Sequence, residues 1–341
     1  MGDCKTFALG DITLQSGVVL PDAKLTYQTY GEINAAHDNV IVLPTFYTGT
    51  HARNEGFFGS GRAMDPTRHF VVSIDMFGNG YSSSPSNTPP PFDGPRFPHV
   101  TLYDNIACQH RLLTEELGVE SIALVAGWSM AGCQSYQWAA QYPNMVRAIL
   151  PFCASAKTSQ HNIVFLEGVK AALCADGNWN NGDYDGQPER GLRAFGRVYA
   201  GWAFSQTFYR EGLYRQLGHE TIEDLLLDWE EDHVQNWDAN NLLTKLWTWQ
   251  NGDISANELY HGDFRAALGA IKAKAILIPC ADDLYFPPKD NEIETLYMPN
   301  ATLRPYSSPW GHCVANPGNV PAFETFLDTC VCDLLSIHEE R

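Results

Sequence analysis

The sequence is short of basic residues, with 22 Lys and Arg against 40 Asp and Glu, so its net charge is −18 over 341 residues. A surface of this sign repels phosphate backbones and anionic lipid, which argues against nucleic acid and membrane as partners. No apolar run reaches the roughly 18 residues that a membrane-spanning helix needs. The N-terminal residues also lack the apolar segment of a secretory signal. We therefore expect a cytoplasmic protein.

Cysteine pairs of the CxxC type are absent, and the nine cysteines form no cluster at metal-ligand spacing. An odd and dispersed set of cysteines indicates reduced thiols. Cys153 and Cys280 lie inside apolar runs, as ordinary core residues do. We expect no metal ion and no cofactor.

Short runs rich in Val, Ile, Leu and Phe recur along the chain with little alternation. Such runs suit strands that are covered on both faces, as in a parallel sheet. Stretches of helical length, such as 105–117 and 132–142, lie between them. The pattern predicts a mostly parallel, doubly wound α/β sheet. The expected strands are 39–46, 69–76, 121–126, 146–153 and 273–280.

The strand–helix alternation stops between residues 155 and 264. This segment has apolar residues at helical spacing, among them Leu192, Phe195 and Tyr199, and it holds six of the nine tryptophans. We predict that 155–264 is a helical lid inserted over the C-terminal edge of the sheet, with tryptophans such as Trp202 near a pocket. Residues 1–154 and 265–341 would then form the α/β core.

The segment around Ser129 has the features of a nucleophile elbow. An apolar strand enters the turn Gly127-Trp128-Ser129-Met130-Ala131-Gly132, and a helix-forming run follows. Such a turn exposes the serine hydroxyl, and its small residues let neighbouring backbone pass. Ala131 occupies a position where glycine is usual, but it is still small. The Met130 N–H, at a helix N-terminus, would face an oxyanion. The context predicts the α/β-hydrolase fold with Ser129 as nucleophile.

A serine nucleophile needs a histidine base and a carboxylate that orients it, and in this fold the chain order is Ser, acid, His. Asp282 and Asp283 both follow the last long apolar strand, and spacing alone does not choose between them. His312 lies in a loop after the strand-like run 302–306. The loop 43–50, after an early strand, offers a second oxyanion N–H from Tyr47 or Phe46.

These segments together resemble the homoserine O-acetyltransferase family of α/β-hydrolase-fold enzymes, in the same order over nearly the whole chain. The resemblance selects Asp283 over Asp282, places Tyr47 in the oxyanion loop and implies a homodimer. We expect Phe46, Trp128, Arg197 and Cys313 to be substrate-binding residues. The matching motifs are Pro44 to Gly49, Phe97-Pro98-x-Val100-Thr101-x-x-Asp104, Gly127-x-Ser129-Met130-x-Gly132 with Gln134, Asp238-Ala239-Asn240, Asp283-x-x-Phe286-Pro287-Pro288 and Gly311-His312.

Two positions depart from the family pattern, and both concern the substrate. Cys313 stands where the family has an aspartate implied to bind the homoserine amine, and Arg197 lies one residue out of register with the family's lid arginine. A desolvated amine facing a thiol loses a charge-assisted contact of roughly 1.5–3 kcal/mol. The triad therefore carries over from the family, and homoserine as the substrate does not.

The function that we predict is acyl transfer through an acyl-Ser129 intermediate, with Asp283 and His312 completing the triad and the N–H groups of Tyr47 and Met130 forming the oxyanion hole. Hydrolysis of a small ester or thioester is favoured. The alternative is an O-acetyltransferase that uses acetyl-CoA, as a substrate and not a cofactor, on a small alcohol other than homoserine, or less readily on homoserine itself. A non-catalytic ligand receptor or a cyclase on the same fold are lesser alternatives.

Overall fold

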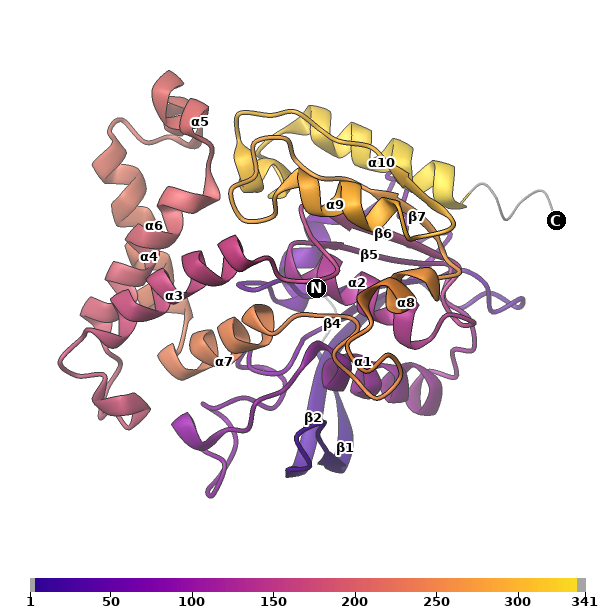
Figure 1. The fold of residues 1–341 in the computed structure, drawn as a ribbon, viewed down its shortest axis with the longest axis horizontal. Helices are drawn as coiled ribbons and strands as arrows, with labels where there is room; N and C mark the ends of the chain where they lie inside the picture. The colour runs from indigo at the N-terminus through magenta and orange to yellow at the C-terminus, as the bar shows by residue number, and fades with distance from the viewer. Residues whose placement is uncertain (1–3, 336–341) are drawn as a thin grey trace.

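A computed structural model describes residues 4–335 of the chain, and its centre is an eight-stranded sheet with the order β1-β2-β4-β3-β5-β6-β7-β8 (Figure 1). The pairs β1–β2 and β2–β4 are antiparallel, and all other neighbouring strands are parallel. The strands are β1 Lys5–Thr13, β2 Val19–Tyr30, β3 Val40–Pro44, β4 Phe70–Ile74, β5 Leu124–Trp128, β6 Ala148–Phe152, β7 Lys274–Leu277 and β8 Ala301–Leu303.

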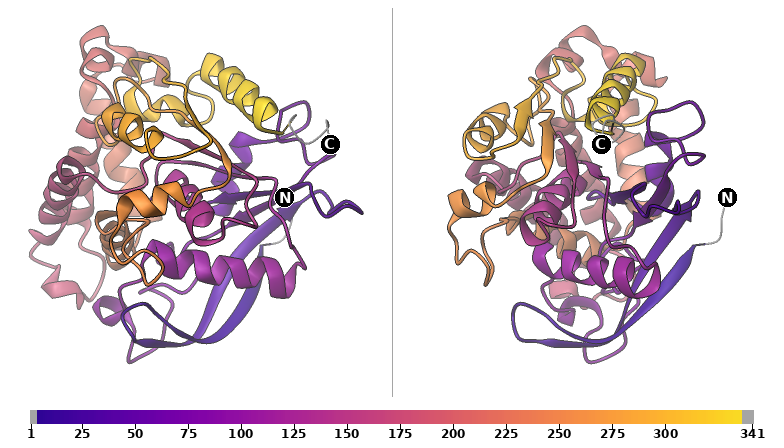
Figure 2. Two further views of the ribbon diagram at one scale, coloured as in Figure 1. Left: turned by 45° about the vertical axis from the view of Figure 1, so that its right-hand side comes forward. Right: turned by 90° about the vertical axis from the view of Figure 1, so that its right-hand side faces the viewer.

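The central strands are buried on both faces because their side chains alternate between two hydrophobic clusters. In β3, Val40 and Val42 belong to one cluster, and Ile41 and Leu43 belong to the other. The helix α10 packs on the face that holds Ile41, and α8 contributes to the opposite cluster (Figure 2). The helices of the core are α1 Leu102–Arg111, α2 Met130–Gln141, α8 Phe264–Gly269, α9 Pro288–Thr295 and α10 Pro321–Leu335.

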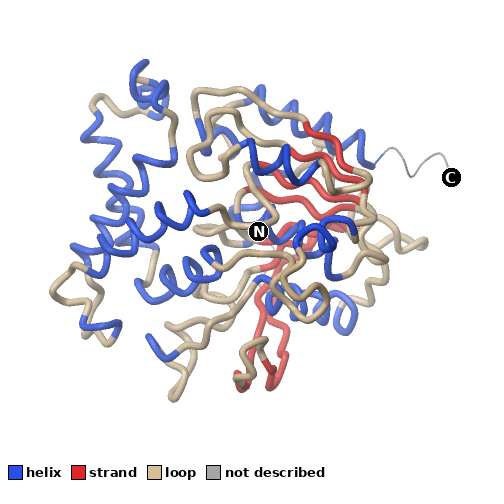
Figure 3. The backbone as a smooth tube through the Cα atoms, viewed as in Figure 1, coloured by secondary structure: helices blue, strands red, loops and turns tan. Residues whose placement is uncertain are grey.

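The segment 155–264, which we call the lid, consists of helices and loops in the structure and contains no named strand among its described residues (Figure 3). The chain enters the lid after β6 and returns to the core at α8, which precedes β7. The division into core and lid stays a prediction. The α-helices of the lid are α3 Gln160–Cys174, α4 Glu189–Ala203, α5 Gln206–Glu211, α6 Ile222–Asn236 and α7 Ala239–Gln250.

The mostly parallel sheet that the apolar runs predict is confirmed, with each expected strand lying within a few residues of an observed one. The N-terminal hairpin β1–β2 was not predicted. Its strands mix exposed, half-buried and buried side chains, and their sequences lack the continuous apolar run that marks the central strands. Within the part of the chain that the structure describes, no helix combines the length and the apolar character that crossing a bilayer requires.

Candidate active site

Ser129 lies at the sharp turn between β5 and α2 with φ 60° and ψ −130°, a conformation that L-residues seldom adopt. The turn depends on small neighbours. A Cβ atom at Gly127 would lie 2.4 Å from the carbonyl carbon of Ala131, and one at Gly132 would lie 2.5 Å from the Cβ of Ala154. The methyl group of Ala131 fits, although glycine is usual there. The sequence therefore forms an elbow that holds the serine in a fixed, strained position.

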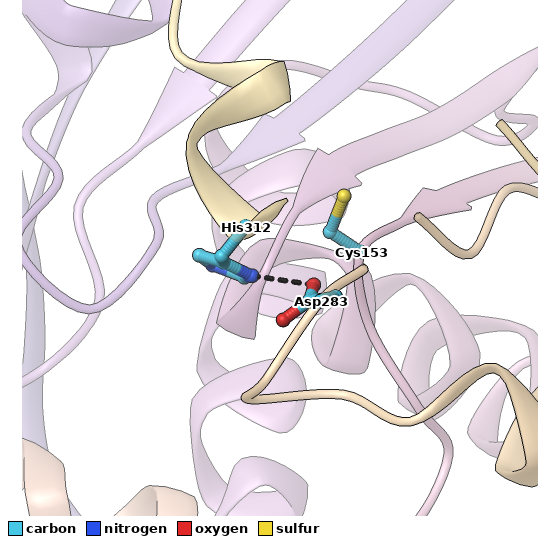
Figure 4. A group of neighbouring side chains, drawn as sticks. All are labelled: Cys153, Asp283 and His312. Carbon is cyan, nitrogen blue, oxygen red and sulfur yellow. Dashed lines mark hydrogen bonds and ion pairs between the residues drawn. The ribbon is translucent and has the colours of Figure 1, made fainter. Parts of the chain in front are cut away.

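Asp283 follows β7, and its carboxylate is joined to His312 by a hydrogen bond of 2.7 Å between Oδ2 and Nδ1 (Figure 4). Its other oxygen accepts the N–H groups of Tyr285 at 2.7 Å and Phe286 at 3.2 Å. Asp283 and His312 are 5% and 4% exposed, whereas Asp282 is exposed. The buried carboxylate thus holds one ring nitrogen and leaves Nε2 of the imidazole for another partner.

The His312 ring is positioned by aromatic neighbours and by the lid. The ring stacks on Trp128 at 5.2 Å between centroids and contacts Tyr285 at 4.4 Å. Gly311, with φ 57°, lies so close to the lid that a Cβ atom there would be 2.8 Å from the backbone nitrogen of Ser205. The Ser205 hydroxyl also donates to the carbonyl of Pro309 at 2.6 Å. The junction of α4 and α5 therefore fixes the loop that carries the histidine.

Ser129 and His312 both line a cavity of about 740 Å³, together with Phe46, Trp128 and Cys313. No hydrogen bond joins Ser129 to His312 in the described chain. Catalytic hydrogen bonds are often long in an unliganded site and shorten when substrate binds. The lid closes the cavity with aromatic residues and places acidic residues of α6 at its rim. The lid residues of the lining include Tyr199, Ala203, Phe204, Asp228, Trp229, Glu231, Asp232 and Trp237.

The tryptophans at this cavity differ in part from the expectation. Trp229 and Trp237 line it, whereas Trp202 packs against Phe165, at 4.9 Å between ring centroids, and is absent from the lining. Helical spacing marked Trp202 as inward-facing, and it is half-buried in the lid. The spacing could not distinguish the interior of the lid from the wall of the cavity.

Two backbone N–H groups near the serine are candidates for an oxyanion hole. Met130 is the first residue of α2, where amides have no carbonyl in the preceding turn. Tyr47 follows β3 and lines the cavity. Neither amide donates to a protein acceptor among the described residues. An amide without a partner is available to an oxygen that carries developing negative charge.

The two positions that depart from the family pattern behave differently in the structure. Cys313 lines the cavity and is 8% exposed. Burial and then the charge of Asp283 raise the pKa of its thiol well above the usual range, so the thiol is neutral. The placement of Arg197 does not fit the substrate-binding role that we expected. Its guanidinium pairs with Glu223 and Glu230 on α6, and it does not line the cavity.

Cys153, at the end of β6, completes a buried group with Asp283 and His312 in which the three potential ligand atoms lie within 4.8 Å of one another (Figure 4). The group does not suit a metal ion. Burial and then the charge of Asp283 raise the pKa of the Cys153 thiol, whereas metals bind the thiolate. The nitrogen of His312 in this group already faces the carboxylate. These three residues are therefore better described as a carboxylate–histidine pair packed against a neutral thiol than as a metal site.

Residues 38–313 match the model of the family described as alpha/beta hydrolase fold. The ethyl acetate hydrolase of Pseudomonas veronii is 35% identical over 314 residues, covering 91% of this chain and 89% of the relative. The homoserine O-acetyltransferase of Chlorobaculum tepidum is 31% identical over 319 residues, covering 88% and 87%. A monoclinic structure of the acetyl esterase MekB superposes with a TM-score of 0.94 at 34% identity, covering 98% of this chain and 97% of the other.

Proposed function

We propose, from the premise that the chain belongs to the alpha/beta hydrolase family, that it hydrolyses small acetate-type esters through an acyl-serine intermediate. The resemblance to homoserine O-acetyltransferases is confirmed, and esterases stand beside them among the similar proteins. The chain is thus an enzyme of the serine-hydrolase type. The proposal concerns which residues act and which acceptor receives the acyl group.

The observation that carries the proposal is a strained serine and the histidine of a buried carboxylate–histidine pair at one cavity, with an unpartnered amide on Tyr47 in its lining and another on Met130 next to the serine. Asp283 holds the imidazole in the tautomer that keeps Nε2 free to take the Ser129 proton. The alkoxide then attacks the ester carbonyl, while the N–H groups of Tyr47 and Met130 bind the oxyanion. His312 returns the proton to the leaving alcohol, and water attacks the acyl-enzyme by the same steps.

The charges at two places in the cavity favour hydrolysis of an ester, with water as the acceptor of the acyl group, over transfer from acetyl-CoA to homoserine. Cys313 offers a neutral thiol where the transferases are implied to bind an amine with a carboxylate. At the rim, Asp228 and Asp232 are exposed and lie with Glu231 on the same helix. Acyl-CoA carries several phosphate charges, which carboxylates at the entrance repel. A neutral ester meets neither obstacle.

The proposal predicts a large difference between two reactions of the wild-type enzyme. Hydrolysis of ethyl acetate or a similar small acetate ester should exceed homoserine acetylation from acetyl-CoA, whose kcat/KM we expect below roughly 10⁴ M⁻¹s⁻¹, the lower end for dedicated enzymes. The reason is that an ammonium group that reaches the buried Cys313 loses its hydration and finds no carboxylate there. Steady-state kinetics with both substrate pairs provides the test.

Two outcomes separate the candidates. A homoserine kcat/KM above that of ester hydrolysis would replace the esterase proposal with the transferase. The variant Cys313→Asp restores the family's carboxylate and should raise homoserine acetylation relative to Cys313→Asn, a neutral polar control of similar size. Equal rates in the two variants would contradict the role that we assign to charge at this position.

The assembly and location of the enzyme are proposals of the same kind. We propose a homodimer, because the transferase family that this chain resembles implies one, and light scattering that gives the mass of a single chain would contradict it. We also propose a cytoplasmic enzyme that needs no cofactor. All nine cysteines are unpaired in the structure, which suits a reducing compartment.

A further inference from the structure

Lys245, on the lid helix α7, is a fully buried lysine that forms no ion pair within the described chain. Its ammonium group donates a hydrogen bond to the backbone carbonyl of Tyr47, a residue that lines the cavity. The same group lies 4.0 Å from the ring centroid of Trp237 and 5.3 Å from that of Tyr47. A buried amine thus sits behind the oxyanion loop.

Two further hydrogen bonds hold this loop, one from the side chain of Tyr47 to the lid and one from the core to Thr45. The Tyr47 hydroxyl donates to the carbonyl of Leu242, one turn before Lys245 on α7, at 2.9 Å. On the other side, the Gln134 side chain on α2 donates to the carbonyl of Thr45 at 2.9 Å. The peptide between Phe46 and Tyr47, whose carbonyl accepts the N–H of Gly49 at 2.9 Å, therefore lies between two neighbouring peptides that are also anchored.

A lysine in this place carries a cost that an apolar side chain would avoid. Burial lowers the pKa of Lys245 to about 7, a shift that the charge of Asp75 partly opposes. Burying an amine is unfavourable unless its hydrogen bonds are satisfied. Its stem passes Gly78, where a Cβ atom would lie 3.1 Å from the lysine Cγ. The contacts that offset the cost are the hydrogen bond to the Tyr47 carbonyl and the ring of Trp237, 4.0 Å away.

We propose that Lys245 is a positioning residue for the oxyanion hole, which restrains the Tyr47 N–H by holding the next peptide of the loop through the Tyr47 carbonyl. The inference rests on the proposed acyl-transfer function, because it assigns Tyr47 to the oxyanion. It also links the lid to the chemistry, since α7 supplies both contacts to Tyr47. Without the ammonium, the peptide that follows Tyr47 would lose its anchor to the lid, and the neighbouring N–H of Tyr47 would be held less firmly toward the transition state.

The test compares Lys245→Met, which keeps the length of the side chain but removes the donor, with Lys245→Arg, which keeps a donor. With active sites counted by fluorophosphonate titration, Lys245→Met should lower kcat for a small acetate ester by about 10- to 100-fold, up to the loss expected for one oxyanion donor. KM should stay within about twofold, since ground-state binding is not involved. Lys245→Arg should recover most of kcat.

Thr248→Val is the matched control, because Thr248 lies on the same helix and its buried hydroxyl donates to the carbonyl of Val100 at 2.7 Å, away from Tyr47. It should lower thermal stability and leave kcat per titrated site within about twofold. An unchanged kcat in Lys245→Met, or an equal loss in Thr248→Val, would overturn the inference. If Lys245→Met does not fold, Lys245→Leu, which also lacks a donor, is judged by the same criteria.

Failure of this inference is distinguishable from failure of the proposed function. Wild-type enzyme that neither hydrolyses esters nor reacts with the fluorophosphonate would refute the function itself. Normal wild-type turnover with normal turnover in Lys245→Met would refute only the role of Lys245.

Discussion

Replacement of Ser129 by alanine is expected to lower ester turnover by roughly 10⁴- to 10⁶-fold, the loss that follows removal of a serine nucleophile. Without the hydroxyl no acyl-enzyme forms, and only the oxyanion hole and substrate binding remain to accelerate attack by water. The fold should survive, because alanine meets the same backbone strain as serine at φ 60°. Thermal unfolding should therefore change little while turnover collapses.

A fluorophosphonate probe should label wild-type enzyme and leave Ser129→Ala unlabelled. The matched control is Ser135→Ala, in which a buried hydroxyl on the same helix, bonded to the carbonyl of Ala131 at 3.0 Å, is removed. That variant should keep both labelling and turnover. Near-wild-type turnover in Ser129→Ala would remove the nucleophile from the account.

The second large effect is expected at the carboxylate. Asp283→Asn should lower kcat by roughly 10³- to 10⁴-fold, because an amide nitrogen facing Nδ1 of His312 favours the tautomer in which Nε2 carries the proton and cannot act as a base. Asp282→Asn, at the exposed neighbour, should leave kcat within about twofold. Steady-state kinetics on the two variants side by side gives the comparison.

The two aspartates also test how the site was identified. If Asp282→Asn were the damaging change, the hydrogen bond of 2.7 Å between Asp283 and His312 would not be the catalytic one. Equal and small effects in both variants would mean that the histidine needs no carboxylate partner. Either result would contradict the assignment of the triad.

Much of the fold and of the candidate site follows from local sequence, because the responsible signals are continuous in the chain. The elbow around Ser129 joins a buried strand to a helix through small residues, and the apolar runs identify the parallel strands. Asp283 and His312 each follow a strand, so the topology brings them to the same edge of the sheet. Their pairing follows from the order of the strands.

The parts that could not be predicted depend on contacts between distant segments. Lys245 and Tyr47 are 198 positions apart, and nothing near either residue indicates that they meet. In the sequence Cys153 has the features of an ordinary core cysteine in a strand. Its position beside Asp283 depends on the fold and could not be predicted from neighbouring residues. The displacement of Arg197 from the cavity has the same origin, since its partners come from another helix of the lid.

Passage of acyl groups through Ser129 to water can be measured by the partition of a common intermediate between two acceptors. Wild-type enzyme hydrolyses ethyl acetate or phenyl acetate in the presence of methanol, and the ratio of methyl acetate to acetate is measured for each ester. An acetyl-enzyme has lost its leaving group before the acceptor attacks. We therefore expect the same ratio of methyl acetate to acetate from both esters. A ratio that changes with the leaving group would mean that the acceptor attacks the ester directly, and would contradict the acyl-serine intermediate.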